Sequence, residues 1–317
     1  MQAIARNINP FTDFGFKKIF GEEATKDLLL DFINAVLEPE TGPIASLEFS
    51  RNEHLGTGKM DKKVVFDIYC IAESGERFIV EMQKAFQLNL RDRSLYYATY
   101  PVQEQGKRGN WNYSLQPVYC ISILDFSMDP EDGRYLQRVG LMDIETGKRF
   151  SDKLHFVYVE VPKFQKKESE LETKFEKWLY VLKHLEFLER LPGSVREKIF
   201  EKVMDIATIT NLEKKDLRAY EQSLKRYRDL KNALVASEQK GEQIGLEKGE
   251  QIGLEKGEQI GLEKGEQIGL EKGEQKKIRS GIVNLYKENM PLNLIARVME
   301  VSVSEVEKIL KEQGFGR

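Results

Sequence analysis

The segment "VVFDIYCIAESGERFIVEMQK", residues 64–84, decides how the chain folds. It holds two apolar runs joined by residues 74–76, Ser-Gly-Glu, and such a junction between β-branched runs predicts a hairpin. Asp67 lies in the first run and Glu81 in the second. Both faces of each predicted strand are largely apolar, which is typical of a central, buried sheet. The hairpin therefore places two acids in neighbouring strands where little water reaches.

Two buried acids need a physical explanation. Burying an unpaired carboxylate costs several kcal/mol, and two facing carboxylates also repel each other. A divalent cation relieves both problems, and oxygen ligands from one or two carboxylates are what Mg²⁺ prefers. Two other interpretations stay open at this point. One acid faces solvent at a strand end, or each acid pairs with a buried arginine.

Hydrophobic periodicity outlines the rest of the fold. Apolar residues at helical spacing predict helices, and alternating or continuous β-branched runs predict strands. The predicted helices cover residues 11–21, 26–37 and 88–105, and the predicted strands cover residues 45–51, 62–72, 77–85, 117–126, 138–144 and 154–161. Helical stripes follow at residues 175–185 and 217–234. This order predicts an α/β fold, with a central mixed β-sheet flanked by helices and a helical C-terminal extension.

Residues 241–272 consist of the octapeptide "GEQIGLEK" repeated four times without a mismatch. Eight residues advance an α-helix by about 80° beyond two turns, so the apolar positions do not stay on one side as in a heptad coiled coil. Glycine recurs every fourth residue, and each glycine costs a helix about 1 kcal/mol relative to alanine. Two interpretations remain, a flexible spacer or a helix whose glycines pack against a second copy.

The C-terminal tail has helical spacing at residues 278–285 and again at residues 292–301. Ser302 followed by Glu305 is a capping-box pattern that predicts a further helix. The exposed positions of that helix include Glu307 and Glu312, whereas a DNA-reading helix is usually more basic. We therefore favour a small interaction module over a DNA-reading one.

Composition excludes several classes of protein. The net charge is −3, from 49 Lys and Arg against 52 Asp and Glu, so any polyanion must be bound by local basic patches. The candidates are Lys17–Lys18, Arg91 with Arg93, and Lys107–Arg108. Two cysteines in apolar runs and three dispersed histidines argue against a disulfide framework and a zinc site. The sequence contains no apolar run long enough to predict a membrane span. We therefore expect a cytoplasmic protein.

Several segments in order resemble a known group of nucleases. They are "PFTDFGFKKIFG", "LLLDFINAVL", "FDIYC", "FIVEMQ", "RDRSLYYATY" and "PVYCISILDF". Across roughly residues 8–130 the chain resembles the PD-(D/E)XK nuclease superfamily, and within it the Rpn family of recombination-promoting nucleases and transposases. The resemblance implies a restriction-endonuclease-like core. With the patterns above, the predicted organisation is a core at residues 1–165, helices at 166–236, a repeat spacer at 237–276 and a helical tail at 277–317.

The resemblance also implies roles for particular residues. Asp67 and Glu81 become the metal ligands of a DNA endonuclease that uses Mg²⁺, or Mn²⁺. Gln83 falls where the motif usually has a lysine, which stabilises charge building on phosphate and orients the attacking water. Glutamine can orient water but carries no charge. The neighbouring Lys84 is expected on the opposite face of the strand.

Three further residues have two interpretations each. Asp13 either caps the first helix, as Thr12 could, or adds an acid to the site. Arg93 and Tyr97, at helical i and i+4 positions, either hold a phosphate or simply pack.

The predicted function is a Mg²⁺-dependent DNA endonuclease that acts in recombination, mobile elements or defence. The alternative is a nuclease fold with weakened catalysis that serves as a DNA- or protein-interaction module. The uncharged Gln83 and the acidic net charge of the chain favour this alternative. A transposase with three catalytic carboxylates has less support, because no third acid stands out on a strand. The predicted partners are DNA and a second copy of the chain, bound through the C-terminal helices or the repeat.

Overall fold

The structure, a computed structural model, describes residues 5–37, 42–54, 64–107 and 109–315. It forms two compact units, Met1–Val235 and Ala236–Arg317. The strands are β1 (Leu47–Phe49), β2 (Glu53–His54), β3 (Val64–Val65), β4 (Ile68–Ala72), β5 (Arg77–Gln83), β6 (Val118–Leu124), β7 (Leu136–Met142) and β8 (Arg149–Glu160). The α-helices are α1 (Asp13–Phe20), α2 (Lys26–Leu37), α3 (Leu90–Gln103), α4 (Lys174–His184), α5 (Lys198–Ala207), α6 (Lys214–Lys287), α7 (Leu292–Val298) and α8 (Val303–Glu312). Short 3₁₀ turns are η1 (Glu23–Thr25), η2 (Val161–Lys163), η3 (Glu168–Glu170), η4 (Leu185–Phe187), η5 (Gly193–Val195) and η6 (Ile209–Asn211).

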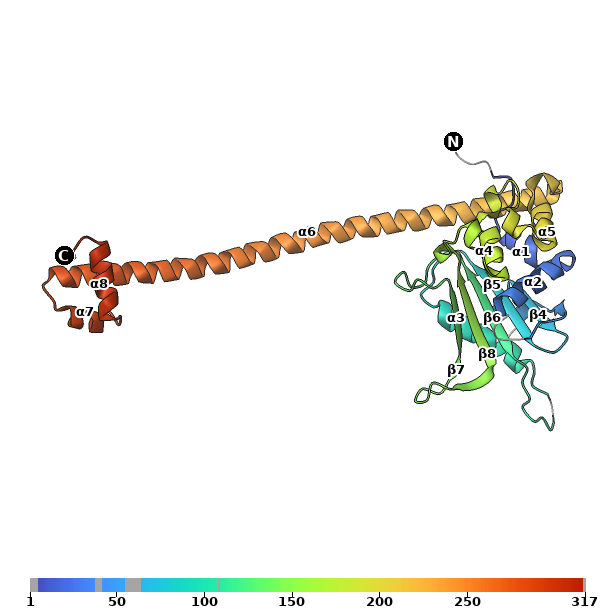
Figure 1. Cartoon of the computed structure of the whole chain (residues 1–317), viewed down its shortest axis with the longest axis horizontal. Coiled ribbons are helices and arrows are strands. Elements are labelled where there is room, and N and C mark those ends of the chain that lie inside the picture. The colour runs from blue at the N-terminus through green and yellow to red at the C-terminus, as the bar shows by residue number, and fades with distance from the viewer. Residues whose placement is uncertain (1–4, 38–41, 55–63, 108, 316–317) are drawn as a thin grey trace. The chain divides into compact units, whose positions relative to one another are not determined.

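A mixed six-stranded sheet forms the centre of the first unit (Figure 1). Its strand order is β1-β4-β5-β6-β8-β7. Strands β5, β6 and β8 are parallel, whereas β1, β4 and β7 join as antiparallel neighbours. The hairpin between β4 and β5 turns at Gly75, whose φ of +103° suits glycine far better than residues with a side chain. The predicted mixed sheet flanked by helices is confirmed.

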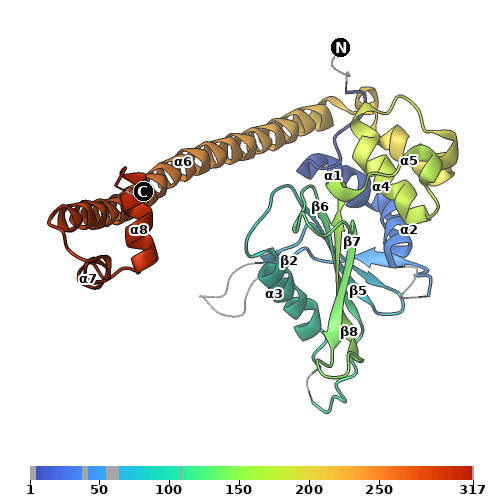
Figure 2. The same cartoon turned by 60° about the vertical axis from the view of Figure 1, so that its left-hand side comes forward.

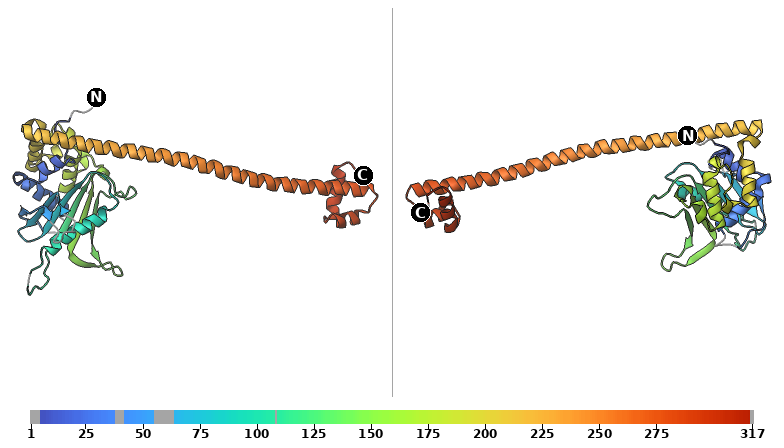
Figure 3. Two further views of the ribbon diagram at one scale, coloured as in Figure 1. Left: turned by 180° about the vertical axis from the view of Figure 1, so that it is seen from behind. Right: turned by 45° about the horizontal axis from the view of Figure 1, so that its top comes forward.

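The two faces of the sheet are covered by different helices, as Figure 3 shows. Phe78, Val80 and Met82 of β5 point into the larger apolar cluster beneath α1, α2, α4 and α5. Ile79 points the other way, into the cluster covered by α3. This alternation along one strand means that Glu81 and Gln83 share the α3 face.

The larger cluster is organised around Trp178 of α4, which is fully buried. Its ring lies 5.5 Å from Phe20, 5.7 Å from Phe32 and 5.0 Å from Phe200, measured between ring centroids. Its indole Nε1 donates a 2.7 Å hydrogen bond to Asp31 Oδ1, so its polar atom is satisfied. The packing of α1, α2, α4 and α5 therefore depends on one aromatic cluster. Of these helices, α5 is not among those that the hydrophobic periodicity predicts.

One predicted strand is wrong in an informative way. Residues 62–72 were expected to form a single strand, but the described part is split into β3 and β4, and residues 62 and 63 lie outside the described residues. Strand β3 pairs with β2 in a separate two-stranded sheet. Asp67 lies in the break, immediately before β4. Asp67 is thus adjacent to the central sheet and not inside one of its strands.

The second unit contains the octapeptide repeat and the tail. The repeat lies inside α6, and within each of the four units a glutamine donates to the glutamate four residues later: Gln243 to Glu247, Gln251 to Glu255, Gln259 to Glu263 and Gln267 to Glu271. Such i,i+4 pairs support a glycine-rich helix by a few tenths of a kcal/mol each.

The end of α6 lies against α7 and α8 in the tail (Figure 2). The apolar cluster between these helices includes Ile282, Ile295 and Ile309. Ser302 caps α8, because its Oγ accepts a 3.2 Å hydrogen bond from the Glu305 amide. This is one of the two hydrogen bonds of the predicted capping box.

Candidate metal and active site

Asp67 is held by a set of hydrogen bonds that replaces ordinary strand pairing. Its amide donates to Glu81 Oε1 at 2.9 Å, and its Oδ2 accepts from the Met82 amide at 3.0 Å. Asn52 Nδ2 donates to the Asp67 carbonyl at 3.1 Å, while Asn52 Oδ1 accepts from the Tyr69 amide at 3.2 Å. These side chains satisfy backbone groups where the β4–β5 ladder stops, so the break at Asp67 is built into the fold.

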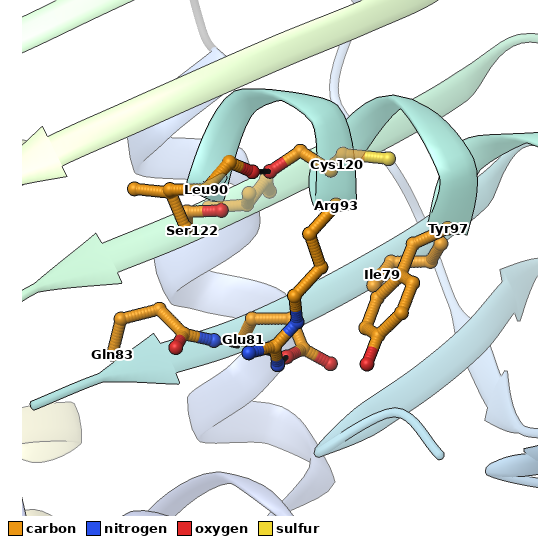
Figure 4. Close-up of a pocket in the computed structure, with 10 residues that line it drawn as sticks. Ile79, Glu81, Gln83, Leu90, Arg93, Tyr97, Cys120 and Ser122 are labelled. Atoms are coloured by element: carbon orange, nitrogen blue, oxygen red, sulfur yellow. Dashed lines mark hydrogen bonds and ion pairs between the residues drawn. The ribbon is translucent and has the colours of Figure 1, made fainter. Parts of the chain in front are cut away.

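Glu81 is buried on β5, with a side chain only 8% exposed, and it has three partners. Besides the Asp67 amide, its Oε2 accepts from Gln83 Nε2 at 3.2 Å and from Arg93 Nη2 at 3.2 Å. The expectation that a buried acid pairs with an arginine therefore holds for Glu81. Figure 4 shows the Arg93 guanidinium reaching from α3 toward the carboxylate.

Burial raises the proton affinity of both acids. Burial raises the pKa of Glu81 to about 7, and the neighbouring Asp67 charge adds to this shift. Burial also raises the pKa of Asp67, while Lys17 and Arg93 act in the opposite direction. The pair therefore carries an electrostatic cost that Arg93 only partly offsets.

A small cavity opens beside Glu81 on the α3 face of the sheet (Figure 4). Its volume is about 10 Å³, close to the space of one water probe. The lining includes Gln83, Arg93, Tyr97, Cys120 and Ser122. The Arg93 guanidinium lies 5.0 Å from the centroid of the Tyr97 ring, a cation–π distance. Arg93 and Tyr97, predicted as a pair, are thus brought together at Glu81.

Asp13 and Lys84 meet on the opposite side of β5. Lys84 Nζ lies 2.6 Å from Asp13 Oδ1, in the first turn of α1. Thr12, and not Asp13, is the N-cap, because its Oγ1 accepts from the Gly15 amide at 2.9 Å. Lys84 is therefore engaged away from Gln83. The charge of Asp13 still raises the pKa of Asp67, so α1 lies close enough to influence the acid pair.

The C-terminal end of β6 adds a contact that the sequence did not indicate. The Asp125 amide donates to the Gln83 carbonyl at 2.9 Å. The Asp125 carboxylate accepts from the Tyr227 hydroxyl at 2.7 Å and lies 2.7 Å from Lys231 Nζ. The early turns of α6 are thereby fixed beside Gln83, within the first unit. No local pattern linked residues 125 and 231, because 106 residues separate them.

The predicted basic patches differ in their surroundings. Lys18 is paired with Asp216 at 2.8 Å and with Glu22 at 3.2 Å, whereas Lys17 is exposed and acts electrostatically on Asp67. Arg91 is exposed on α3. Lys107 is exposed and Arg108 lies outside the described residues.

The oxygen atoms present fit a hard divalent cation. Two carboxylates converge, and Asp67 Oδ1 has no hydrogen-bond partner among the described residues. Mg²⁺ is commonly held by one or two carboxylates, with water and phosphate oxygens as its other ligands. No group of three or more His, Cys, Asp or Glu side chains suited to a metal occurs within the described ranges. The described residues therefore fit a metal site with two carboxylate ligands. One oxygen of Glu81, Oε2, already accepts a hydrogen bond from Arg93.

The fold and its comparisons define the class of the protein. The mixed six-stranded sheet with helices on both faces fits a restriction-endonuclease-like α/β fold. The family model of the PD-(D/E)XK nuclease family transposases matches residues 10–237. No curated protein and no solved structure matches the chain. The chain belongs to the PD-(D/E)XK nuclease family of transposases, whose members are nucleases that typically use divalent metals and bind DNA.

Proposed function

We propose that this protein is a divalent-metal-dependent DNA endonuclease that uses Mg²⁺, with Mn²⁺ as a substitute. The observation that carries the proposal is the interlocked pair of Asp67 and Glu81. Their 2.9 Å amide-to-carboxylate bond fixes the half-buried Asp67 beside the buried Glu81 at a break in the sheet. If the two acids bound no cation, their burial and mutual repulsion would destabilise the folded protein without any functional gain.

Asp67 and Glu81 would hold the cation, which supplies positive charge to the scissile phosphate and lowers the pKa of a bound water. Gln83 Nε2 lies 3.2 Å from Glu81 Oε2, a position from which its amide can orient the attacking water. Arg93 supplies the positive charge that Gln83 lacks, because its guanidinium is always protonated and reaches the same carboxylate oxygen. With the cation bound, water would attack phosphorus in line with the leaving oxygen, so that a new P–O bond would form as the old one breaks, and the proton of the water would pass to solvent.

One observation favours the alternative, a nuclease fold with weakened catalysis that acts as a DNA- or protein-interaction module. Glu81 is already bonded to Arg93, and the position usually held by lysine carries no charge. A chain that had lost its metal would be stabilised by this internal pairing. Metal affinity separates the two functions, because only the endonuclease requires the acid pair to exchange Arg93 for a cation.

A nicking assay on supercoiled plasmid tests the proposal directly. We expect relaxed circles and then linear DNA with Mg²⁺ or Mn²⁺, and no cleavage in EDTA. Calorimetric titration of the DNA-free protein with Mn²⁺ provides a second readout. Absence of both cleavage and metal binding would establish the interaction module instead.

The setting of this activity is also a proposal. Cys70 and Cys120 are buried and free, as expected for a protein of the reducing cytoplasm. Among the residues that the structure describes, no helix combines the length and apolar character needed to cross a membrane. We assign the enzyme to DNA recombination or to the movement or restriction of mobile elements. We also propose that the protein associates with a second copy of itself through the repeat or the C-terminal helices.

A further inference from the structure

The loop between α3 and β6 is closed at its base by two glutamines. Gln105 Nε2 donates to the Gln116 carbonyl at 3.3 Å, and the Gln116 amide donates to Gln105 Oε1 at 2.7 Å. Gln105 is buried and also donates to the Pro101 carbonyl at 3.0 Å. The two ends of the loop are thus held together, and the loop extends away from the end of the sheet (Figures 1 and 3). Such a clamp lowers the entropy lost when the loop binds a partner.

Two aromatic rings are presented on this loop. The Trp111 and Tyr113 ring centroids lie 4.8 Å apart with 36° between the ring planes. Tyr113 is 77% exposed, and neither ring belongs to the buried apolar clusters of the described residues. Tyr113 has a φ of +57°, a left-handed conformation that is uncommon for a bulky residue. The Ser114 amide donates to Asn112 Oδ1 at 3.2 Å and braces this turn.

The composition of the loop selects the kind of partner. From Gln105 to Pro117 the sequence contains no Asp or Glu, although the whole chain has a net charge of −3. Lys107 is exposed, and Asn110, Asn112 and Ser114 offer amide and hydroxyl groups. An exposed tyrosine and a half-buried tryptophan, on a loop that carries a lysine and no acids, match the chemistry that binds unpaired nucleic-acid bases. A protein partner would more commonly be met by a larger apolar patch.

We propose that Trp111 and Tyr113 form a stacking platform for an unpaired base of the DNA substrate. The inference rests on the proposed nuclease function and narrows its substrate to DNA with single-stranded or distorted segments. The strand register gives the spacing along the sheet between the loop and the acid pair. The loop enters β6 at Val118, whereas Ser122, four residues further along, pairs with Glu81. Four strand residues span about 13 Å, and the loop residues between Val118 and the two rings add to this distance, so a single strand of several nucleotides would be needed to contact both the platform and the acid pair.

The two tryptophans of the chain make a direct test possible. Trp178 is fully buried, so Trp111 is the residue whose fluorescence a bound base can quench. The full-length protein is titrated in EDTA with an oligothymidylate of about 12 nucleotides and with a blunt duplex. We expect quenching by the single strand, no such quenching in a Trp111→Phe variant, and tighter binding of the single strand than of the duplex at one salt concentration.

Fluorescence anisotropy with a labelled oligonucleotide measures the contribution of each ring. Trp111→Ala and Tyr113→Ala should each weaken single-strand binding about 10-fold, with little effect on duplex binding. Phe187→Ala, which removes a 50% exposed aromatic ring on η4, is the matched control and should leave both affinities unchanged. Single-strand affinity that is unchanged in both loop variants would overturn the platform.

The same experiment separates this inference from the proposed function. If the wild-type protein binds the single strand through Trp111 and Tyr113 but does not cleave plasmid, the nuclease function fails and the platform stands. If it cleaves with Mg²⁺ while the loop variants bind and cleave like the wild type, the platform fails and the nuclease stands.

Discussion

The backbone amide of Asp67 donates a 2.9 Å hydrogen bond to the carboxylate of Glu81, so one acid is positioned by the main chain of the other. Asp67 Oδ2 returns to the β5 backbone through the Met82 amide. The two carboxylates therefore accept hydrogen bonds from backbone amides of β5 and residue 67, in place of the β4–β5 ladder bonds that stop before Ile68. Their geometry exists before any ligand binds, which is the preorganisation that a catalytic pair needs.

Asp67→Asn and Glu81→Gln should each reduce Mg²⁺-dependent plasmid nicking by about 100-fold or more, because each removes one charged oxygen ligand. Both variants keep an oxygen that can accept from the Met82 or Asp67 amide, so the fold should survive. Circular dichroism checks the fold and gel electrophoresis of plasmid measures the rate. Glu73→Gln, an exposed acid in the same hairpin, is the control and should cleave normally. Either site variant cutting at the wild-type rate would refute the metal assignment.

The raised pKa of Glu81 predicts a pH-dependent effect on stability. The carboxyl of the unfolded chain ionises with the ordinary glutamate pKa of 4.5 and that of the folded chain near 7, so the folded chain keeps the proton longer. By linkage, the contribution of Glu81 to the stability of the wild type falls as pH rises from about 4.5 through 7, and its full penalty applies above 7. A shift of this size corresponds to about 3 kcal/mol.

Glu81→Gln removes this titration. In EDTA it should therefore raise the melting temperature relative to wild type at pH 8 and change it little at pH 4.5. Thermal denaturation at both pH values measures this difference. An equal effect at both pH values would show that the carboxyl is not held protonated by burial.

Arg93→Ala should affect metal binding and catalysis in opposite directions. Removing the guanidinium frees Glu81 Oε2, so the protein should bind Mn²⁺ several-fold more tightly in calorimetric titration. Cleavage should fall at least 10-fold, since the positive charge beside the phosphate is lost. Arg93→Lys keeps a charge and should recover part of the rate. Weaker metal binding in Arg93→Ala would mean that Arg93 supports the ligands and does not compete with the cation.

Gln83→Lys should retain or increase cleavage, because it restores a positive charge beside Glu81, where Gln83 Nε2 now donates at 3.2 Å. Gln83→Ala should reduce the rate. Lys84→Ala should have a smaller effect, since Lys84 is bound to Asp13 on the other side of β5. Single-turnover rates at saturating Mg²⁺ compare the three variants. An inactive Lys84→Ala beside an active Gln83→Ala would assign the motif position to Lys84.

Local periodicity was enough to predict most of the core. The stripe in α2 and the apolar runs of β5 and β6 are long and uninterrupted, so their type follows from the sequence. The break at Asp67 was not predictable in this way. Val65 and Phe66 continue an apolar run, and the hydrogen bonds that Asp67 makes at the break come from Asn52, Glu81 and Met82 in other segments.

The candidate site was predictable to the same extent. Asp67 and Glu81 follow from one hairpin, and Arg93 from its spacing with Tyr97. Asn52, Lys17 and Lys231 approach from segments distant in sequence, where a single polar residue gives no signal of its partner. The ion pair between Lys84 and Asp13 also depends on where α1 packs against the sheet, which the local sequence does not indicate.

Removing two copies of the octapeptide tests the proposed role of the repeat. A Cβ placed on any repeat glycine meets nothing within 4 Å, and the repeat isoleucines and leucines are 41–75% exposed. The repeat therefore lacks an internal apolar partner, and each unit has a net charge of −1, which disfavours contact with phosphate. We expect a chain lacking residues 249–264 to cleave at the wild-type rate per active site, because Asp67 and Glu81 belong to the other unit. Its molar mass by light scattering should fall if the repeat carries self-association. Loss of cleavage in a folded deletion variant of unchanged mass would show instead that the repeat acts on the active site.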